Sequence, residues 1–290
     1  MNIRTVGVVG CGLMGSGIAE VTARAGYTTL VREMNDELLA RGRQRIETSM
    51  GTAVERGKLP AAERDAALAR LTGTTRLEEF AACDLVIEAA TENPDIKKRT
   101  FAELDQICPP HAILASNTSS IPIINMATST RRPDKVLGMH FMNPVPVMRL
   151  IEYVRTLTTS DATLETAREF GESLGKRIIV SKDRGGFIVN FLLIPYLCES
   201  VRMYEQGFAS KEDIDVGMML GTSYPMGPFT LLDYVGLDTT LYIADILFDE
   251  FKESRFAAPT LLRQMVAAGY LGRKTGRGFY NYRAGELPPR

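Results

Sequence analysis

The 290-residue chain is 45% hydrophobic and 24% charged, which is typical of a globular protein with a sizeable core and excludes a disordered chain. Its 34 basic residues nearly balance its 35 acidic residues, so no overall field favours nucleic acid or an anionic membrane as a partner. A single core rarely grows past roughly 250 to 300 residues, so the length predicts two domains.

Neither the cysteines nor the apolar segments predict a metal site, a secretory signal or a membrane span. The four cysteines, at positions 11, 83, 108 and 198, lack metal-ligand spacing, and we expect structural thiols in a reducing compartment. The first nine residues show no signal-peptide pattern. The longest apolar stretch, residues 187–198, is short and interrupted by Asn190 and Pro195. We therefore expect a cytoplasmic protein.

Residues 5–9 form a β-branched run that leads into Gly10-Cys11-Gly12-Leu13-Met14-Gly15 and then into a helical pattern over residues 16–25. This order of strand, glycine loop and helix is the dinucleotide-binding fingerprint. Gly10 permits a tight turn, Gly12 lets the backbone approach a pyrophosphate, and Gly15 lets the helix pack on the strand. The loop, with Leu13 and Met14, is therefore the predicted phosphate-binding element at a helix N-terminus.

Glu33 follows the second predicted strand, residues 28–32, and lies 23 residues after Gly10. An acid about 20 residues past the glycine loop binds the ribose hydroxyls of the adenosine. Because a carboxylate repels a ribose phosphate, we expect NAD rather than NADP, although the neighbouring Arg32 weakens that preference. The competing interpretation of Glu33 is a solvated surface charge.

Residues 35–70 are helical and highly charged, with a break at residues 56–60 that divides them into two helices. The pair is either a solvated hairpin or a contact for an anionic, extended ligand. In the second case we expect the contacts to come from Ser49, Arg56 and Lys58.

Two later strands deliver polar residues to one edge of the predicted sheet. Residues 84–89 form a buried strand, followed by Glu92 and by a helix that carries Lys97. Residues 113–115 form another strand, followed by the polar run Ser116-Asn117-Thr118-Ser119-Ser120. Ligands of open parallel sheets bind outside the carboxyl ends of the strands. We expect Ser119 to serve the ligand and Ser120 to cap a helix near residue 122.

The chain has two histidines, and His140 stands at the end of a strand predicted over residues 136–141, before an Asn143-Pro144 turn. Glu152 lies on the apolar face of a strand predicted over residues 148–155, and a buried carboxylate needs a partner. That partner is either His140 or an arginine. Taken alone, His140 is as consistent with a packed core histidine as with a catalytic one.

A helix over residues 161–174 and a strand over 177–180 complete the first predicted domain, residues 1–184, and residues 183–186 form a hinge. The second predicted domain, residues 185–290, is mainly helical and begins with an apolar stripe that Asn190 interrupts. Asn190 either satisfies a nearby backbone group or binds substrate. A glycine-rich basic turn at residues 272–280 closes the chain.

The chain resembles the short-chain 3-hydroxyacyl-CoA dehydrogenase family, especially bacterial 3-hydroxybutyryl-CoA dehydrogenases, over nearly its whole length. The resemblance rests on the glycine loop, the 116–120 run, the segment 138–146 around His140, Glu152, and the segments 186–190, 225–229 and 272–280. It implies an α/β fold with a Rossmann-type, mostly parallel sheet and an inserted helical hairpin, followed by an all-α domain that forms a homodimer. The activity it implies is the NAD-dependent oxidation of an L-3-hydroxyacyl-CoA, such as 3-hydroxybutyryl-CoA, to the 3-oxoacyl-CoA.

The resemblance also assigns roles to individual residues. His140 and Glu152 are the implied catalytic pair, Ser119 and Asn190 contact the reacting oxygen, and Asn143 supports the site. The implied cofactor contacts beside the glycine loop are Glu33, Glu92, Lys97 and Asn117. The implied coenzyme A contacts are Ser49 and either Arg56 or Lys58.

Two residues near Asn190 depart from the family pattern, and they leave the acyl group open. Gly185 stands where a proline is usual, and Phe191 stands where an arginine is common. One alternative is therefore a dehydrogenase of a hydroxyacyl group held on an acyl carrier protein, similar to hydroxymalonyl-carrier dehydrogenases. Another alternative is a dehydrogenase fold reused as a non-catalytic NAD-binding protein. The presence of His140, Glu152 and Ser119 together with Asn190 argues against the second.

Overall fold

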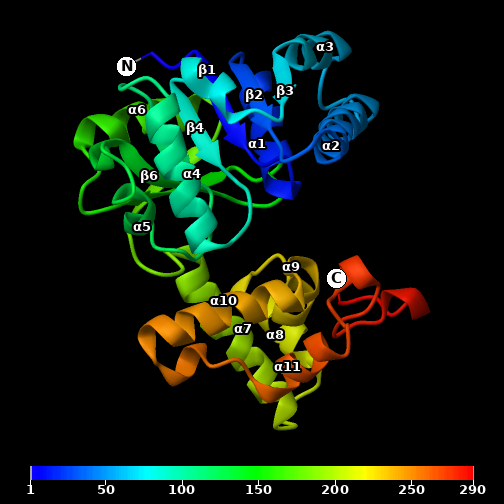
Figure 1. Cartoon of the computed structure of the whole chain (residues 1–290). Coiled ribbons are helices and arrows are strands. Elements are labelled where there is room, and N and C mark those ends of the chain that lie inside the picture. Colours follow the sequence, from blue (N-terminus) through cyan, green and yellow to red (C-terminus); the bar gives the residue numbers. More distant parts are fainter. Residues whose placement is uncertain (1, 290) are drawn as a thin grey trace. The chain divides into compact units, whose positions relative to one another are not determined.

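The computed structural model describes residues 2–289, which divide into two compact units, residues 2–184 and residues 185–289. Each unit has its own buried apolar core. Figure 1 shows the strands of a sheet with flanking helices in the first unit and helices in the second. No helix within residues 2–289 is long and apolar enough to cross a membrane.

An eight-stranded sheet organises the first unit, in the order β3-β2-β1-β4-β5-β6-β7-β8. All neighbouring strands are parallel except β6 and β7, which confirms the expected mostly parallel sheet. β3 is a short strand that the sequence pattern did not predict. The strands are β1 (Thr5–Val9), β2 (Thr28–Arg32), β3 (Leu71–Thr74), β4 (Leu85–Glu88), β5 (Ile113–Ser116), β6 (Val136–Phe141), β7 (Leu150–Arg155) and β8 (Arg177–Lys182).

Helices cover this sheet, and the predicted hairpin is present as α2 and α3, which both pack against α1. Apart from one polar residue at an end of each, strands β1, β4 and β5 are apolar and buried, as expected for parallel strands covered on both faces. The helices are α1 (Leu13–Arg24), α2 (Asp36–Glu55), α3 (Ala61–Ala69), α4 (Pro94–Ile107), α5 (Ile124–Ala127) and α6 (Asp161–Ser173), with 3₁₀ helices at Leu77–Ala82 and Pro133–Lys135.

The start of α4 is set by an asparagine cap. The side chain of Asn93 accepts hydrogen bonds from the amides of Asp95 and Ile96, each at 3.0 Å, and Pro94 occupies the first helical position. The cap therefore sets where the helix that carries Lys97 begins.

The predicted cap of the helix near residue 122 is wrong. The amides of Ile123 and Ile124, at the start of α5, donate instead to the carboxylate of Asp183, at 2.9 and 2.7 Å. Thr118 Oγ1 accepts from the amides of Ser120 and Ile121, so the polar run closes on itself as a turn. A carboxylate distant in sequence thus takes the place of the local serine.

Asp105, on α4, ties that helix to the chain that enters β6. It is 5% exposed and accepts from the amide and Nε of Arg131, each at 3.1 Å, and from Nε of Arg132 at 2.7 Å. Burial by itself raises the pKa of Asp105, but these hydrogen bonds together outweigh it and hold the pKa below its ordinary value. The ionised carboxylate is therefore the form that stabilises this junction.

The second unit is a bundle of helices in which α7 contacts α9, α10 and α11. The predicted stripe on α7 is buried, with Ile194, Leu197, Cys198 and Val201 at most 1% exposed. The helices are α7 (Val189–Glu205), α8 (Lys211–Thr222), α9 (Pro228–Val235), α10 (Leu237–Phe251) and α11 (Thr260–Ala267), with 3₁₀ helices at Ser254–Phe256, Arg273–Thr275 and Tyr282–Ala284.

The closing glycine-rich turn is clamped by Asp233 of α9. The carboxylate of Asp233 accepts from the amides of Phe279 and Tyr280 at 2.8 and 2.9 Å. A Cβ atom on Gly278 would lie 1.9 Å from Asp233 Oδ1, and one on Gly272 would lie 2.3 Å from the Asp233 carbonyl oxygen. The glycines therefore allow the backbone to approach α9 closely.

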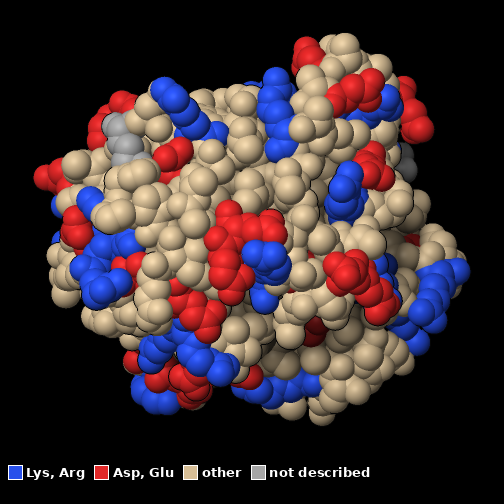
Figure 2. All heavy atoms as spheres, turned by 45° about the horizontal axis from the view of Figure 1, so that its top comes forward, with Lys and Arg blue, Asp and Glu red and all other residues tan. Residues whose placement is uncertain are grey.

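The state of the cysteines and the distribution of surface charges agree with what the composition predicts. All four cysteines are free and buried, and burial raises the pKa of Cys11 to about 11, which keeps its thiol protonated and unreactive near neutral pH. On the face shown in Figure 2, basic and acidic side chains lie next to one another. This mixture corresponds to the net charge of −1.

Candidate active site

The order of the strands reverses between β1 and β4, and a ligand crevice is expected at such a point. Gly10, after β1, has φ of +95°, and a Cβ there would lie 2.8 Å from the carbonyl oxygen of Ala89, after β4. A Cβ on Gly15 would lie 1.8 Å from the Gly10 carbonyl oxygen, whereas one on Gly12 meets no atom within 4 Å. Gly10 therefore makes a turn that requires glycine, Gly12 leaves space for a ligand to approach the backbone, and Gly15 packs the helix closely on the loop. This arrangement fits a dinucleotide pyrophosphate.

Glu33 lies against this loop rather than extending freely into solvent. Its Oε1 accepts a hydrogen bond from the Cys11 amide at 2.6 Å, and its Oε2 accepts from the Met34 amide at 3.0 Å. Helix α2 also holds the loop, because Arg45 Nη1 donates to the Cys11 carbonyl oxygen at 3.2 Å. The carboxylate is therefore fixed next to the glycine backbone, the position expected for a ribose contact.

His140 and Glu152 face each other across the antiparallel pair β6 and β7, where they are directly opposite in register. His140 Nδ1 lies 3.1 Å from Glu152 Oε2. His140 is 7% exposed and Glu152 is fully buried. Of the two partners that the sequence allowed for Glu152, the geometry shows the histidine.

This hydrogen bond selects a tautomer of the imidazole. An ionised carboxylate only accepts hydrogen bonds, so when Glu152 is ionised and the imidazole is neutral, Nδ1 carries the proton and Nε2 keeps a lone pair. Asn117 supports the same strand, because its Oδ1 accepts from the amide of Phe141 at 2.9 Å. The arrangement can therefore take up a proton at Nε2 while the carboxylate stabilises the resulting cation.

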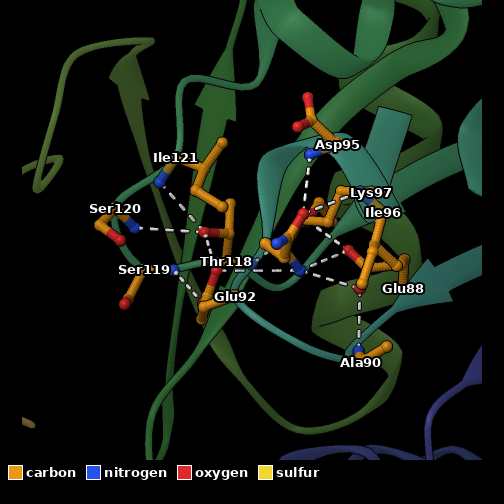
Figure 3. A network of polar contacts seen from close by, with 12 residues as sticks. Glu88, Ala90, Glu92, Asp95, Ile96, Lys97, Thr118, Ser119, Ser120 and Ile121 are labelled. Atoms are coloured by element: carbon orange, nitrogen blue, oxygen red, sulfur yellow. Dashed lines mark hydrogen bonds and ion pairs between the residues drawn. The ribbon is translucent and has the colours of Figure 1, made fainter. Parts of the chain in front are cut away.

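A buried ionic network lies at the ends of β4 and β5 (Figure 3). Lys97 Nζ donates to both oxygens of Glu88, at 2.8 and 2.7 Å, and each residue is 1% exposed. The hydroxyl of Ser116 and the amide of Ala90 also donate to Glu88, each at 2.8 Å. Four hydrogen bonds therefore converge on the Glu88 carboxylate.

Glu92 connects this network to the polar run after β5. It accepts from Thr118 Oγ1 at 2.7 Å and from the Ser119 amide at 3.3 Å, and its carboxylate lies 3.9 Å from Lys97 Nζ. The structure thus brings together three predicted site residues, Glu92, Lys97 and Ser119. Sequence reasoning missed Glu88, although an acid that ends a buried apolar strand is a signal that was available.

The remaining predicted residues of the first unit lie at its surface or near it. Asn143 is exposed in the loop after β6, and its peptide bond to Pro144 is cis. Ser49, on α2, is half-buried and close to the buried carboxylate of Glu20, whose pKa it lowers against the stronger opposing effect of burial. Arg56 and Lys58 are exposed between α2 and α3. Their assignment to coenzyme A stays a prediction.

Asn190 belongs to the second unit, where it is 8% exposed at the start of α7. The next residue, Phe191, packs its ring against those of Phe251 and Phe256, with centroids 5.5 and 5.3 Å apart. The guanidinium of Arg255 lies 4.8 Å from the Phe191 ring centroid. A cation therefore stands beside the position where the family commonly has an arginine.

The space beside Gly185, the other departure from the family pattern, is occupied by a side chain of the second unit. A Cβ on Gly185 would lie 2.4 Å from Glu250 Oε2, so the glutamate side chain occupies space that a larger residue would need. The two unusual residues are thus accommodated by residues at the end of α10 and just after it.

Comparison with known proteins agrees with this architecture. The 3-hydroxyacyl-CoA dehydrogenase NAD binding domain matches residues 5–184, and the 3-hydroxyacyl-CoA dehydrogenase C-terminal domain matches residues 186–282. A 3-hydroxybutyryl-CoA dehydrogenase of Mycobacterium tuberculosis is 52% identical over 97% of this chain and 99% of its own length. Human mitochondrial hydroxyacyl-coenzyme A dehydrogenase is 44% identical over 97% of this chain and 92% of its own.

A solved structure shows the same fold. The crystal structure of (S)-3-hydroxybutyryl-CoA dehydrogenase from Ralstonia eutropha matches with a TM-score of 0.92 and 44% identity, covering 97% of this chain and 99% of that one. Both family domains are matched in order along the chain. The chain therefore belongs to the 3-hydroxyacyl-CoA dehydrogenase family and is an NAD-dependent oxidoreductase.

Proposed function

We propose that the chain catalyses the reversible oxidation of a short-chain L-3-hydroxyacyl-CoA, such as 3-hydroxybutyryl-CoA, to the 3-oxoacyl-CoA. The observation that carries this proposal is the buried His140–Glu152 pair on adjacent strands of a sheet whose glycine loop fits NAD. The names of the relatives from Mycobacterium tuberculosis and Ralstonia eutropha support the short chain, and the second also supports the stereochemistry.

His140 is the proposed general base. Oxidation of a secondary alcohol removes a hydride and a proton, and Nε2 of His140 takes the hydroxyl proton because a free alkoxide is too unstable near neutral pH. Glu152 holds the proton on Nδ1 and stabilises the imidazolium. In the reverse direction His140 returns the proton to the carbonyl oxygen.

Three further residues complete the proposed catalytic set. The hydroxyl of Ser119 and the amide of Asn190 hydrogen-bond to the reacting oxygen, and Asn143 supports the loop that follows β6. Figure 3 supports the role of Ser119, because its hydroxyl points away from the network that its amide joins. The support for Asn190 is its burial, since a polar side chain in an apolar stripe needs a specific partner.

The proposed cofactor site uses the glycine loop for the pyrophosphate and Glu33 for the adenosine ribose. Glu92, Lys97 and Asn117 complete it on the other side of β1, at the ends of β4 and β5. The chemistry that NAD supplies when bound is the acceptance and return of a hydride. A carboxylate fixed next to the loop favours NAD over NADP, because it repels a ribose phosphate.

The helical hairpin is the proposed site for coenzyme A. Arg56 and Lys58 are exposed cations at its turn, and Ser49 lies on the α2 side. Two exposed cations suit the phosphates of an extended anionic ligand. A carrier protein needs a docking surface instead, so the two substrate classes separate experimentally.

The deciding experiment compares the reduction of acetoacetyl-CoA by NADH with the oxidation of a carrier-bound hydroxyacyl group. We expect kcat/KM for acetoacetyl-CoA to exceed that for the carrier-bound group by at least about a hundredfold. Equal or greater efficiency on the carrier would contradict the coenzyme A assignment. NADH binding without turnover of either substrate would instead support a non-catalytic NAD-binding protein.

We also propose that the chain forms a homodimer through its second unit and that it is located in the cytoplasm. Large apolar side chains are exposed on and between α7 and α8, with Leu192 67%, Phe208 75% and Leu220 78% exposed. Four free thiols support a reducing compartment. Sedimentation equilibrium of the wild type should give twice the mass of one chain. The double variant Leu192→Lys/Leu220→Lys should give the mass of one chain.

A further inference from the structure

Glu88 is a buried, hydrogen-bonded carboxylate, and the proposed mechanism gives it no role. It ends β4 and receives four hydrogen bonds, two from Lys97 Nζ, one from the Ser116 hydroxyl and one from the Ala90 amide. A buried charge pair is weak evidence for stability, because desolvation offsets much of its attraction. The network is therefore better explained by what it positions.

We propose that Glu88 is a positioning residue that acts through Lys97 on Glu92 and Ser119. This inference deepens the proposed function and rests on it. Lys97 is 1% exposed, with both oxygens of Glu88 within 2.8 Å of Nζ and the Glu92 carboxylate at 3.9 Å. Lys97 thus bridges one buried carboxylate and one partly exposed carboxylate.

The distances determine how the bridge works. Because Glu88 neutralises Lys97 at close range, the longer contact to Glu92 leaves that carboxylate able to accept from Thr118 Oγ1 and the Ser119 amide. If Glu88 loses its charge, Glu92 becomes the nearest carboxylate to Lys97. The 3.9 Å contact then closes, and Glu92 is drawn away from the loop that carries Ser119.

The displaced groups are those that the proposed reaction uses. Glu92 is a proposed cofactor contact, and its side chain is 35% exposed, so it can reach a ligand. Ser119 is a proposed contact of the reacting oxygen, and its amide is held by Glu92. Figure 3 shows the whole path from Glu88 to Ser119. A small shift along this path misaligns the reacting groups, which costs rate steeply.

The test uses Glu88→Gln and the double variant Glu88→Gln/Lys97→Met, in which no unpaired charge is buried. For each we measure the dissociation constant of NADH by fluorescence, kcat and KM for acetoacetyl-CoA, and Tm. Glu88→Gln should weaken NADH binding and lower kcat at least about tenfold, with KM for acetoacetyl-CoA within about twofold. Two neighbours on α4, the half-buried Lys98 and the exposed Glu103, give matched controls, Lys98→Met and Glu103→Gln, which should leave all four values unchanged.

The double variant separates positioning from mere stability. Its Tm should exceed that of Glu88→Gln, and its kcat at saturating NADH should rise at least about threefold above that of Glu88→Gln, because no cation then draws Glu92 away from the loop that carries Ser119. Its NADH affinity should stay low, because Lys97 is itself a proposed cofactor contact. A double variant whose Tm recovers while kcat stays at the level of Glu88→Gln would overturn the inference, as would unchanged values in Glu88→Gln. If the wild type binds NADH but does not reduce acetoacetyl-CoA, the proposed function fails, and the NADH dissociation constants still decide the role of Glu88.

Discussion

Replacement of Glu152 by glutamine removes the charge of the catalytic pair with little change of shape. Glu152 is fully buried and lies 3.1 Å from His140 Nδ1. The glutamine carbonyl can still accept from Nδ1, so the tautomer is retained. What is lost is the attraction between the carboxylate and the imidazolium that forms when His140 takes the substrate proton.

The size of the loss follows from Coulomb's law. Two unit charges about 4 Å apart interact by about 4 kcal/mol at an effective dielectric constant of about 20. The hydrogen bond that glutamine keeps recovers about 1 kcal/mol. A net loss of about 3 kcal/mol in the transition state corresponds to a fall in kcat of roughly a hundredfold.

Steady-state oxidation of 3-hydroxybutyryl-CoA with NAD measures this effect, and fluorescence titration with NADH provides the control. We expect NADH affinity to change less than about twofold, because the pair lies on β6 and β7 whereas the glycine loop follows β1. Glu172→Gln, an exposed change on α6, should leave kcat unchanged. A Glu152→Gln enzyme with the fold intact and kcat within threefold of wild type would refute the role given to the pair.

Other sites give independent predictions. Gly12→Ala should change the free energy of unfolding by less than about 1 kcal/mol but weaken NADH binding at least about tenfold. Gly15→Ala should lower the free energy of unfolding, measured in urea, by at least about 3 kcal/mol, because a Cβ at Gly15 meets backbone atoms whereas a Cβ at Gly12 meets none. Glu33→Ser should raise the NADPH to NADH ratio of kcat/KM at least about tenfold. Asp105→Asn should lower the unfolding free energy at pH 7, and the difference from wild type should shrink as pH falls below the unfolded pKa near 3.8, because the folded pKa lies lower still.

The contrary results are equally specific. Equal NADH affinity in wild type and Gly12→Ala would show that the loop does not bind the pyrophosphate. An unchanged NADPH to NADH ratio of kcat/KM in Glu33→Ser would show that the carboxylate does not determine the choice of cofactor. A stability difference for Asp105→Asn that is constant from pH 7 to pH 3 would show that its charge does not stabilise the fold.

Much of the sheet was predictable because its signals are local. A β-branched run before a glycine loop determines β1 and the start of α1, and the Asn93-Pro94 pair determines where α4 begins. β3 was missed because four residues, LTGT, carry no alternation and include a glycine. That strand exists because β2 offers it a parallel partner.

The candidate site was only partly predictable. Most of the predicted polar residues stand at or near the end of a strand or helix, although Glu152 lies within β7 and Ser49 within α2, so their places along the chain were readable. Partners were not readable, because pairing across strands depends on register. His140 and Glu152 meet because β6 and β7 are antiparallel and in register, and a shift by one residue would turn one side chain to the other face.

The sequence by itself determined the dinucleotide fold, the family and the candidate residues, because glycine loops, caps and apolar runs act over a few neighbouring residues. Only the tertiary structure decided which charges share a proton or a partner. It paired His140 with Glu152, engaged Lys97 with Glu88, and gave the α5 cap to Asp183 instead of Ser120. These contacts join groups distant in the chain, and their strength depends on burial, which exists only in the folded protein.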